Sequence, residues 1–358
     1  MIPYYCLMII PILAGWQIHR SDGLYLRKRK TAAPITAFFL ILAFLLMFRG
    51  LSVGSDTMNY RYFFHRIRRL QWNELGEFGL EYAYVLLNKA VSVLTDHEQG
   101  LFIVSALLSL IPMYILYKED WNYAPLKILI FVNLSMFPML FSGIRQAIAV
   151  SVGIIAYFFV RRKQFLWFLV TVVVAFLFHR SAFVLLALYP ACHIRLRKKH
   201  LWFVVPIIAA IFVFNRQIFA LLTLFIGDYF GSVAMTQTGA YTIILLFSLF
   251  SIFSFVIPEE SMLDDETIGL RNVLLLATCL QFFAPLHTIS MRMNYYFIIF
   301  IPVLLPRVIL CAKQNMKQVA HFANIVMCVF FFAYYFLTAY SGGDTLNLYP
   351  YSFFWENR

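Results

Sequence analysis

A few ionisable side chains stand where long apolar runs end, and their types indicate phosphate chemistry. Arg145 lies in the stretch FSGIRQAIAV between two runs with the composition of membrane helices, and Arg49 and Arg292 also stand at the ends of apolar runs. A planar guanidinium binds phosphate oxygens through two parallel hydrogen bonds, and two or three of them stabilise the charge on a departing diphosphate. We therefore expect Arg145, Arg292 and Arg49 to bind a diphosphate, with contact to lipid head groups as the alternative.

The same part of the sequence carries groups able to accept a proton. A diphosphate leaves well without a general acid, so transfer to a hydroxyl needs a carboxylate or a neutral imidazole near the attacking oxygen. Asp56, Glu81 and His179 are the candidate bases, and Asp56 fits equally well as the N-cap of a following helix. Four more residues are candidate accessory groups, the tyrosines among them as stacking faces for sugars or as interface anchors: Gln146, Tyr60, His287 and Tyr296.

The composition predicts that membrane helices hold these groups. Hydrophobic residues make up 62% of the chain and charged residues 13%, and the mean hydropathy is +0.78. The apolar runs are continuous rather than alternating with polar residues, which favours helices. We predict an all-α fold in which residues 1–358 form a single polytopic integral membrane domain. About 12 transmembrane helices are expected, at Pro3–Ile18, Ala32–Phe48, Gly100–Tyr117, Pro125–Phe141, Ile144–Val160, Phe165–Phe178, Ser181–Ile194, Leu201–Phe214, Tyr241–Ile257, Ile268–Leu286, Asn294–Leu310 and Ala320–Tyr340.

Basic residues indicate which side of the membrane each connection faces. The segment Glu81–Thr95 is apolar but short and carries charge, so we expect it to be interfacial or re-entrant. The positive-inside rule then places one set of basic clusters in the cytoplasm: Arg27–Lys30, Lys118 with Lys127, Arg161–Lys163, Arg195–Lys199, and Lys313 with Lys317. The opposite face carries both termini, an outer loop at residues 49–80 with an interfacial helix, and a second outer loop at residues 215–240.

Other functional classes fit the sequence less well. The formal charge of +12 lies mainly in short links between apolar runs, where it records orientation, so no nucleic-acid partner is expected. The cysteines are scattered without a close pair, which gives no metal site or disulfide framework. A flippase or other transporter would place ionisable groups at mid-membrane along a path, whereas the charges here stand at the ends of the runs.

Five stretches between residues 49 and 297 together resemble the EpsG/Wzy-like polysaccharide polymerases of bacterial cytoplasmic membranes. They are RGLSVGSDTMNY at Arg49–Tyr60, LEYAYVLLN at Leu80–Asn88, GIRQAIA at Gly143–Ala149, FHRSAF at Phe178–Phe183 and RMNYYF at Arg292–Phe297. The resemblance implies a glycosyltransferase of GT-C-like helical architecture that joins repeat units carried on undecaprenyl diphosphate, at the outer face of the cytoplasmic (inner) membrane.

The resemblance also implies roles for individual residues. Arg145 and Arg292 match diphosphate-binding arginines, while Arg49, Asp56, Glu81 and His179 match the other polar positions of the pattern. The outer loops hold no Asp-x-Asp pair, so neither a metal nor a cofactor is expected. The implied partners are a lipid-linked glycan donor and acceptor, the bilayer, and a chain-length regulator and a flippase. An O-antigen ligase, which transfers the same donor to another acceptor, and a lipid-linked oligosaccharide flippase remain the alternatives.

Overall fold

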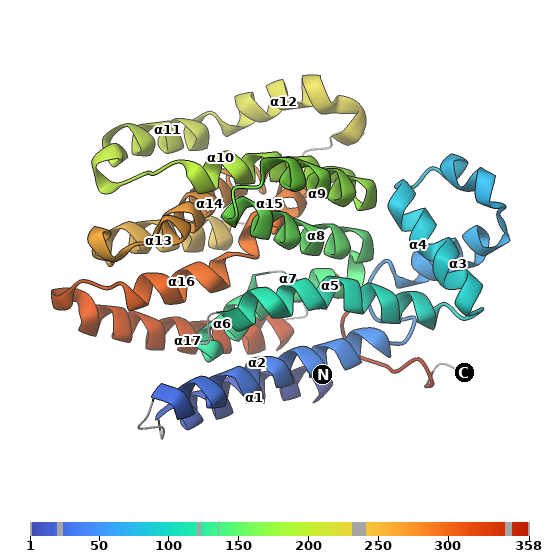
Figure 1. Ribbon diagram of the computed structural model, residues 1–358, viewed down its shortest axis with the longest axis horizontal. Coiled ribbons are helices and arrows are strands. Elements are labelled where there is room, and N and C mark those ends of the chain that lie inside the picture. The colour runs from blue at the N-terminus through green and yellow to red at the C-terminus, as the bar shows by residue number, and fades with distance from the viewer. Residues whose placement is uncertain are drawn as a thin grey trace. The chain divides into compact units, whose positions relative to one another are not determined.

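The computed structural model describes residues 2–19, 24–119, 123–134, 136–230, 241–340 and 346–356, and it is 81% helix. These residues contain no strands, and their extended pairings are two isolated bridges, Arg49 with Phe353 and Pro258 with Ala312. The expected all-α fold is therefore confirmed. The chain divides into two compact units, Met1–Phe183 with Ala323–Arg358, and Val184–Phe322 (Figure 1).

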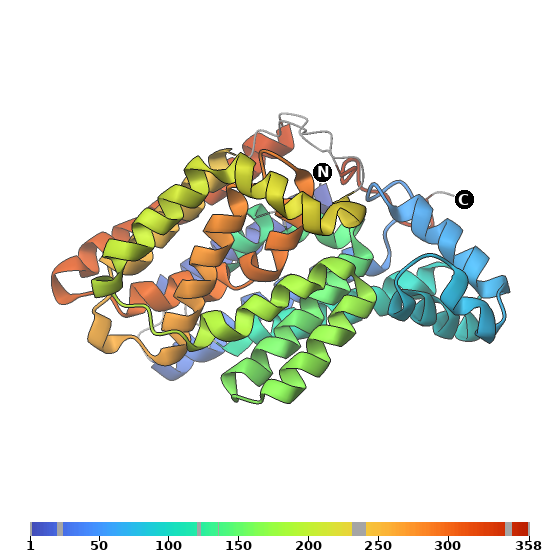
Figure 2. The same ribbon diagram turned by 90° about the horizontal axis from the view of Figure 1, so that it is seen from above.

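The first unit consists of long apolar helices, with a more polar segment of shorter helices, α3 to α4, between α2 and α5. Its elements are α1 (Ile2–His19), α2 (Leu24–Met47), α3 (Thr57–Arg69), η1 (Trp72–Glu77), α4 (Tyr82–Leu94), α5 (Gln99–Glu119), α6 (Ala124–Asn133), α7 (Met136–Ser142), α8 (Ile144–Arg161), α9 (Phe165–Phe178) and the C-terminal part of α17 (Lys317–Tyr340). Helices α8 and α9 run side by side, and α8 also packs against α5 (Figure 1, Figure 2). Small residues allow this approach, since the Ser151 hydroxyl of α8 donates to the Ser109 carbonyl of α5 at 2.5 Å.

The second unit is arranged around α14. Its elements are the end of η2 (Arg180–Ala187), α10 (Leu188–His193), η3 (Lys198–His200), α11 (Leu201–Val213), α12 (Asn215–Phe230), α13 (Tyr241–Val256), η4 (Glu260–Met262), α14 (Asp265–Gln281), α15 (Thr288–Ile298), α16 (Ile301–Leu310), η5 (Gln314–Met316) and the start of α17. Helices α10, α13, α15 and α16 all contact α14. Asp264 caps α14, because its carboxylate accepts the Thr267 amide at 2.7 Å.

The described helices provide fewer straight spans than the sequence predicted. Three segments are long and apolar enough to cross a membrane, Gln99–Glu119, Ile144–Arg161 and Gln314–Thr338, and six candidates result if each of three bent helix pairs is one span. The expected runs Pro125–Phe141 and Asn294–Leu310 are both bent pairs. In each, the second helix has a proline in its first turn, Pro138 or Pro302, and proline cannot donate the backbone bond that would continue the first helix.

Two connections also differ from their expected form. The expected outer loop at residues 215–240 is helical as far as Phe230, where α12 ends, because NRQIFALLTLFI is apolar enough to form a helix; residues 231–240 lie outside the described part. The expected span Ser181–Ile194 is the 3-10 helix η2 followed by the six-residue α10. In contrast, a surface helix does follow Asp56, and α4 has 13 residues, too few to cross a bilayer.

Candidate functional site

Arg145 and Glu81 form an ion pair between two helix starts of the first unit. Arg145 lies in the first turn of α8 and Glu81 is the N-cap residue of α4. The guanidinium Nη1 donates to the carboxylate Oε2, and the guanidinium also lies over the Tyr84 ring, 5.8 Å from its centroid. The Arg145 side chain is 27% exposed and that of Glu81 is 12% exposed. A candidate phosphate-binding cation and a candidate base are thus in direct contact.

This contact determines the protonation of Glu81. Burial alone would raise the pKa of the Glu81 carboxyl, but the charge of Arg145 and a backbone hydrogen bond lower it. Glu81 therefore stays ionised at neutral pH and is a weak proton acceptor. Its geometry suits it to orienting the Arg145 guanidinium better than to taking a proton from a hydroxyl.

Tyr60 connects the surface helix α3 to the start of α8. Its hydroxyl donates to the carbonyl of Ser142 at 3.1 Å and accepts the amide of Ile144 at 3.1 Å. Burial first, and then the charge of Asp56, raise the pKa of Tyr60 to about 12, so the hydroxyl keeps the proton that it donates. The ring is 3% exposed, which leaves no open face for a sugar. Tyr60 positions the turn before Arg145.

Asp56 occupies the N-cap position of α3, as its sequence context predicted, but its side chain makes no capping hydrogen bond. The half-buried carboxylate has no ion pair or hydrogen bond within the part of the chain that the structure describes. Asp56 precedes Tyr60 by four residues, about one helical turn, and its charge acts on the Tyr60 hydroxyl. Of the two candidate carboxylates, Asp56 is the one that is not paired with a cation in the described residues.

His179 follows the last residue of α9, and its local contacts select one tautomer. Its Nδ1 accepts the backbone N–H of Ser181 at 3.3 Å and lies 2.7 Å from the Ser181 hydroxyl. A backbone N–H can only donate, so Nδ1 carries no proton and the neutral ring has its proton on Nε2. In this tautomer His179 offers a hydrogen-bond donor at Nε2. Helix α9 packs against α4, which brings His179 into the surroundings of Glu81.

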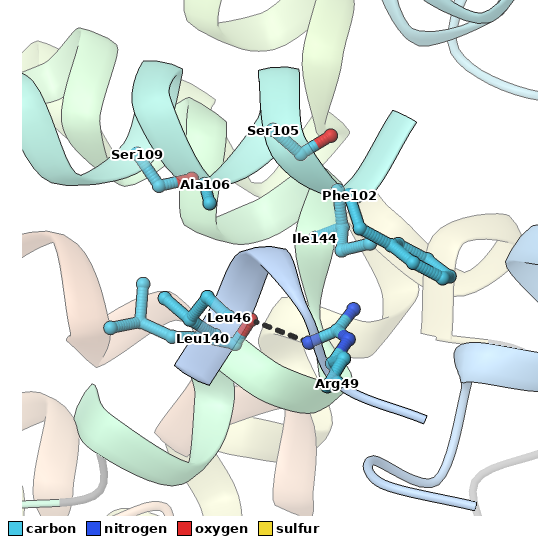
Figure 3. Close-up of a pocket in the computed structure, with 8 residues that line it drawn as sticks. All are labelled: Leu46, Arg49, Phe102, Ser105, Ala106, Ser109, Leu140 and Ile144. Carbon is cyan, nitrogen blue, oxygen red and sulfur yellow. Dashed lines mark hydrogen bonds between the residues drawn. The ribbon is translucent and has the colours of Figure 1, made fainter. Parts of the chain in front are cut away.

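Arg49 is buried, which corrects the expectation that it lies at the membrane surface. Its side chain is 1% exposed and lies over the Phe102 ring at 4.7 Å, while Nη1 donates a long bond of 3.4 Å to the Leu140 carbonyl (Figure 3). Burial lowers the pKa of Arg49 to about 10, although Tyr60, Tyr4 and other tyrosines act to raise it, so the group remains cationic at neutral pH. In this arrangement Arg49 does not reach a ligand at the surface.

A segment near the C-terminus pairs through its backbone with the loop that begins at Arg49. Backbone bonds join residues 346–354 to residues 48–55, including Gly50 N–H to Ser352 carbonyl at 2.7 Å and Gly54 N–H to Asn347 carbonyl at 2.8 Å. Gly54 has a positive φ of +93°, and a Cβ there would stand 2.4 Å from the Phe141 carbonyl oxygen. We call residues 346–356 the tail segment. No sequence pattern signalled this pairing, since it is non-local.

The remaining candidate residues fall in two places. Gln146, next to Arg145, is 4% exposed in the first unit. In the second unit, His287 caps α15 by accepting the Ile289 amide on Nδ1 at 3.0 Å, and burial followed by the charge of Arg292 lowers its pKa. Arg292 is exposed on α15, and Tyr296 is 1% exposed, which removes its ring from contact with a sugar.

Sequence reasoning missed a cluster around Glu98. The Glu98 carboxylate is 9% exposed and accepts from Arg61 Nε at 3.2 Å and from His65 Nε2 at 3.1 Å. Arg61 and His65 are four residues apart on one face of α3, the helix that the sequence predicted to be interfacial. The cluster instead fixes α3 to the start of α5. The one available signal was an acidic residue standing immediately before an apolar run.

Comparison with known proteins identifies the family. A family model described as "EpsG family" matches residues 33–353. A search of curated proteins and a search of solved structures each give no match. The matched range includes every candidate site residue and nearly the whole chain. The chain therefore belongs to the EpsG family of polysaccharide-polymerase-like membrane proteins.

Proposed function

We propose that this protein is a glycosyltransferase that polymerises oligosaccharide repeat units carried on undecaprenyl diphosphate, at the outer face of the bacterial cytoplasmic membrane. The observation that carries the proposal is the partly exposed Arg145, oriented by Glu81 at the start of α8. Glu81 accepts from Nη1, whereas a guanidinium has five N–H donors, so other donors remain for phosphate oxygens. The exposed fraction of Arg145 gives a ligand access to them.

The reaction is a displacement at the anomeric carbon of the donor. The acceptor hydroxyl oxygen bonds to that carbon, the bond from carbon to the diphosphate oxygen breaks, and its electron pair leaves with the diphosphate. Arg145 stabilises the leaving charge, and Arg292 supplies a second guanidinium, as the family resemblance implies. The hydroxyl proton passes to Asp56, since Glu81 is held by Arg145 and His179 carries its proton on Nε2. His179 donates a hydrogen bond to the ligand.

The membrane setting is part of the proposal. Positive-inside asymmetry supports an active site on the outer side, where Asp56, Glu81, Arg145 and His179 lie near the ends of apolar runs. The fold would be of the GT-C-like kind, and catalysis needs neither metal nor cofactor because the arginines neutralise the diphosphate. The partners are the lipid-linked donor and acceptor glycans and, for export and length control, a flippase and a chain-length regulator.

Analysis of lipid-linked glycans tests the proposal. A strain without this protein should accumulate single repeat units on undecaprenyl diphosphate, and purified protein should extend such units in the presence of a metal chelator. Transfer of the unit to a different lipid or protein acceptor, without extension, would establish a ligase instead. Accumulation of the units on the cytoplasmic leaflet only would establish a flippase.

A further inference from the structure

The second unit contains an apolar cavity of about 360 Å³ between α10, α11 and α14. Aliphatic side chains line it, among them Pro190 of α10, Ile207 and Ile211 of α11, and Leu275 of α14. Apolar protein cavities of roughly 150 Å³ already hold a molecule the size of benzene. This cavity has room for a longer hydrocarbon segment, and its lining favours one.

A buried polar group in the cavity wall lacks a partner. Asn272 lines the cavity and is 4% exposed. Its amide nitrogen donates to the carbonyls of Ala191 at 2.9 Å and Ile194 at 2.5 Å, which fixes the orientation of the amide. The Asn272 Oδ1 atom has no hydrogen-bond partner. A buried acceptor left unpaired is costly, so this atom points to a ligand that brings a donor group such as a hydroxyl.

Cations stand at the end of the cavity where Ile194 and Leu196 line it. Arg197 follows Leu196 in the sequence, and Lys198 lies beside Lys313, close enough for the two ammonium groups to repel each other. Arg195, on the other side of Leu196, is already paired with Asp265 at 2.5 Å. The carboxylate near Lys198 is that of Glu260, and its Oε1 already accepts from the buried Arg271 at 2.7 Å. An excess of positive charge therefore remains beside an apolar cavity.

We propose that this cavity is a binding site for an anionic glycerophospholipid of the leaflet that faces the basic loops. One acyl chain occupies the cavity between α11 and α14, and the phosphate lies against Lys198 and Lys313. A hydroxyl of the head group donates to Asn272 Oδ1. Charge complementarity selects an anionic phospholipid over a zwitterionic one, since each lysine near an anionic lipid surface is worth about fivefold in affinity. The site is independent of the proposed transferase activity.

Lipid analysis of the purified full-length protein tests this site. Phospholipids that co-purify in mild detergent are quantified by mass spectrometry, and the ratio of phosphatidylglycerol to phosphatidylethanolamine is compared with that of the source membrane. The wild-type protein should be enriched in phosphatidylglycerol severalfold. The variant Ile207→Trp should lose that enrichment, because the ring fills the cavity. Val205→Trp is the matched control: both residues are 55% exposed on α11, and Ile207 but not Val205 lines the cavity.

A second pair of variants separates the head group from the chain. Lys198→Gln with Lys313→Gln should lose the severalfold enrichment, so that the ratio returns to that of the source membrane, whereas Arg162→Gln with Lys163→Gln, in a basic loop of the first unit, should keep it. These two double variants leave the cavity unfilled, so they test the role of the basic residues even if the tryptophan variant fails to fold. Equal loss in all four variants, no enrichment in the wild type, or retention of a polyprenyl phosphate in place of phospholipid would overturn the proposal.

Discussion

Arg145 and Glu81 are paired across 64 residues of sequence, and the pair places a cation and an anion at two adjacent helix starts. The chemistry of each side chain in the pair differs from its chemistry in isolation. An isolated Glu81 would be a general base, and an isolated Arg145 would be a mobile cation. Paired, the carboxylate loses basicity and the guanidinium gains a fixed orientation, which is the property that binding a developing charge requires.

Replacing Arg145 by lysine should lower the rate of repeat-unit extension on the order of tenfold to thousandfold, because lysine keeps the charge but loses the planar donor geometry. The rate is measured with purified protein and lipid-linked repeats. Arg161→Lys is the control, since Arg161 ends the same helix and pairs with Glu119 in an analogous way. An unchanged rate for Arg145→Lys would show that Arg145 is an interfacial anchor only.

The Arg145–Glu81 pair should make stability depend on pH. The pKa of Glu81 is lowered in the folded protein, so the pair stabilises the fold above the ordinary glutamate range and its contribution is lost as pH falls through the lowered pKa. The melting temperature should therefore fall more steeply on acidification in the wild type than in Glu81→Gln. Glu119→Gln should follow the wild type, because its pair with Arg161 is exposed. Parallel curves for all three proteins would contradict this account.

Two substitutions of His179 distinguish a hydrogen-bond donor from a base. Asparagine places an acceptor near the Nδ1 position and preserves the bond from Ser181, whereas glutamine places an N–H donor near the Nε2 position. If His179 donates to the ligand, His179→Gln should retain more activity than His179→Asn, by roughly tenfold. A base at this position predicts equal loss in both, measured as the rate of extension under saturating donor.

Asp56→Asn should abolish most activity, on the order of a hundredfold to ten-thousandfold, while binding of the lipid-linked donor stays nearly intact. In the proposed mechanism the carboxylate contacts the acceptor hydroxyl rather than the diphosphate. Single-turnover rates and donor binding are measured separately. Asp96→Asn, at an exposed aspartate paired with Arg68, is the control and should leave the rate unchanged. Wild-type turnover in Asp56→Asn would remove Asp56 from the mechanism.

Gly54→Ala should destabilise the protein well beyond about 1 kcal/mol, because both the positive φ and the nearby Phe141 carbonyl exclude a side chain. Gly79→Ala measures the destabilisation caused by the positive φ alone, because Gly79 has a φ of +82° and an added Cβ there would have no atom within 4 Å. Thermal unfolding in detergent compares the two. A similar melting temperature for both variants would mean that the loop moves away from Phe141 without cost.

The sequence predicted the helices well where local composition determines the structure, and poorly where single prolines or long-range contacts determine it. Apolar runs indicated the helices, yet Pro138 and Pro302 bend two of the expected spans, because a proline interrupts backbone bonding that an average over hydropathy does not register. The positive-inside rule placed certain helix connections on the same side, and within each unit two of these connections do lie close together. Arg161 contacts Glu119 in the first unit, and Lys198 lies beside Lys313 in the second.

The candidate site was found residue by residue, but its geometry was not. Residue type identified Arg145 and Glu81 separately, and only the packing of α4 near α8 reveals their contact. Arg49 was expected to bind a diphosphate or lipid head groups because it ends an apolar run, whereas its side chain is buried against Phe102 and the carbonyl of Leu140. Tautomer selection at His179 likewise depends on a backbone amide position that residue type does not encode.

The pairing of the tail segment with residues 48–55 also has a consequence for biosynthesis. Ser52 and Ser352, whose hydroxyls lie 2.8 Å apart, are separated by 300 residues, so the ribosome completes nearly all helices before the partner of this loop exists. Until then the amides of Gly50 and Gly54 must bond to water or lipid head groups. The loop that carries Asp56 thus reaches its final conformation late, after membrane insertion of the preceding helices, and a nascent chain arrested before residue 346 lacks a formed site.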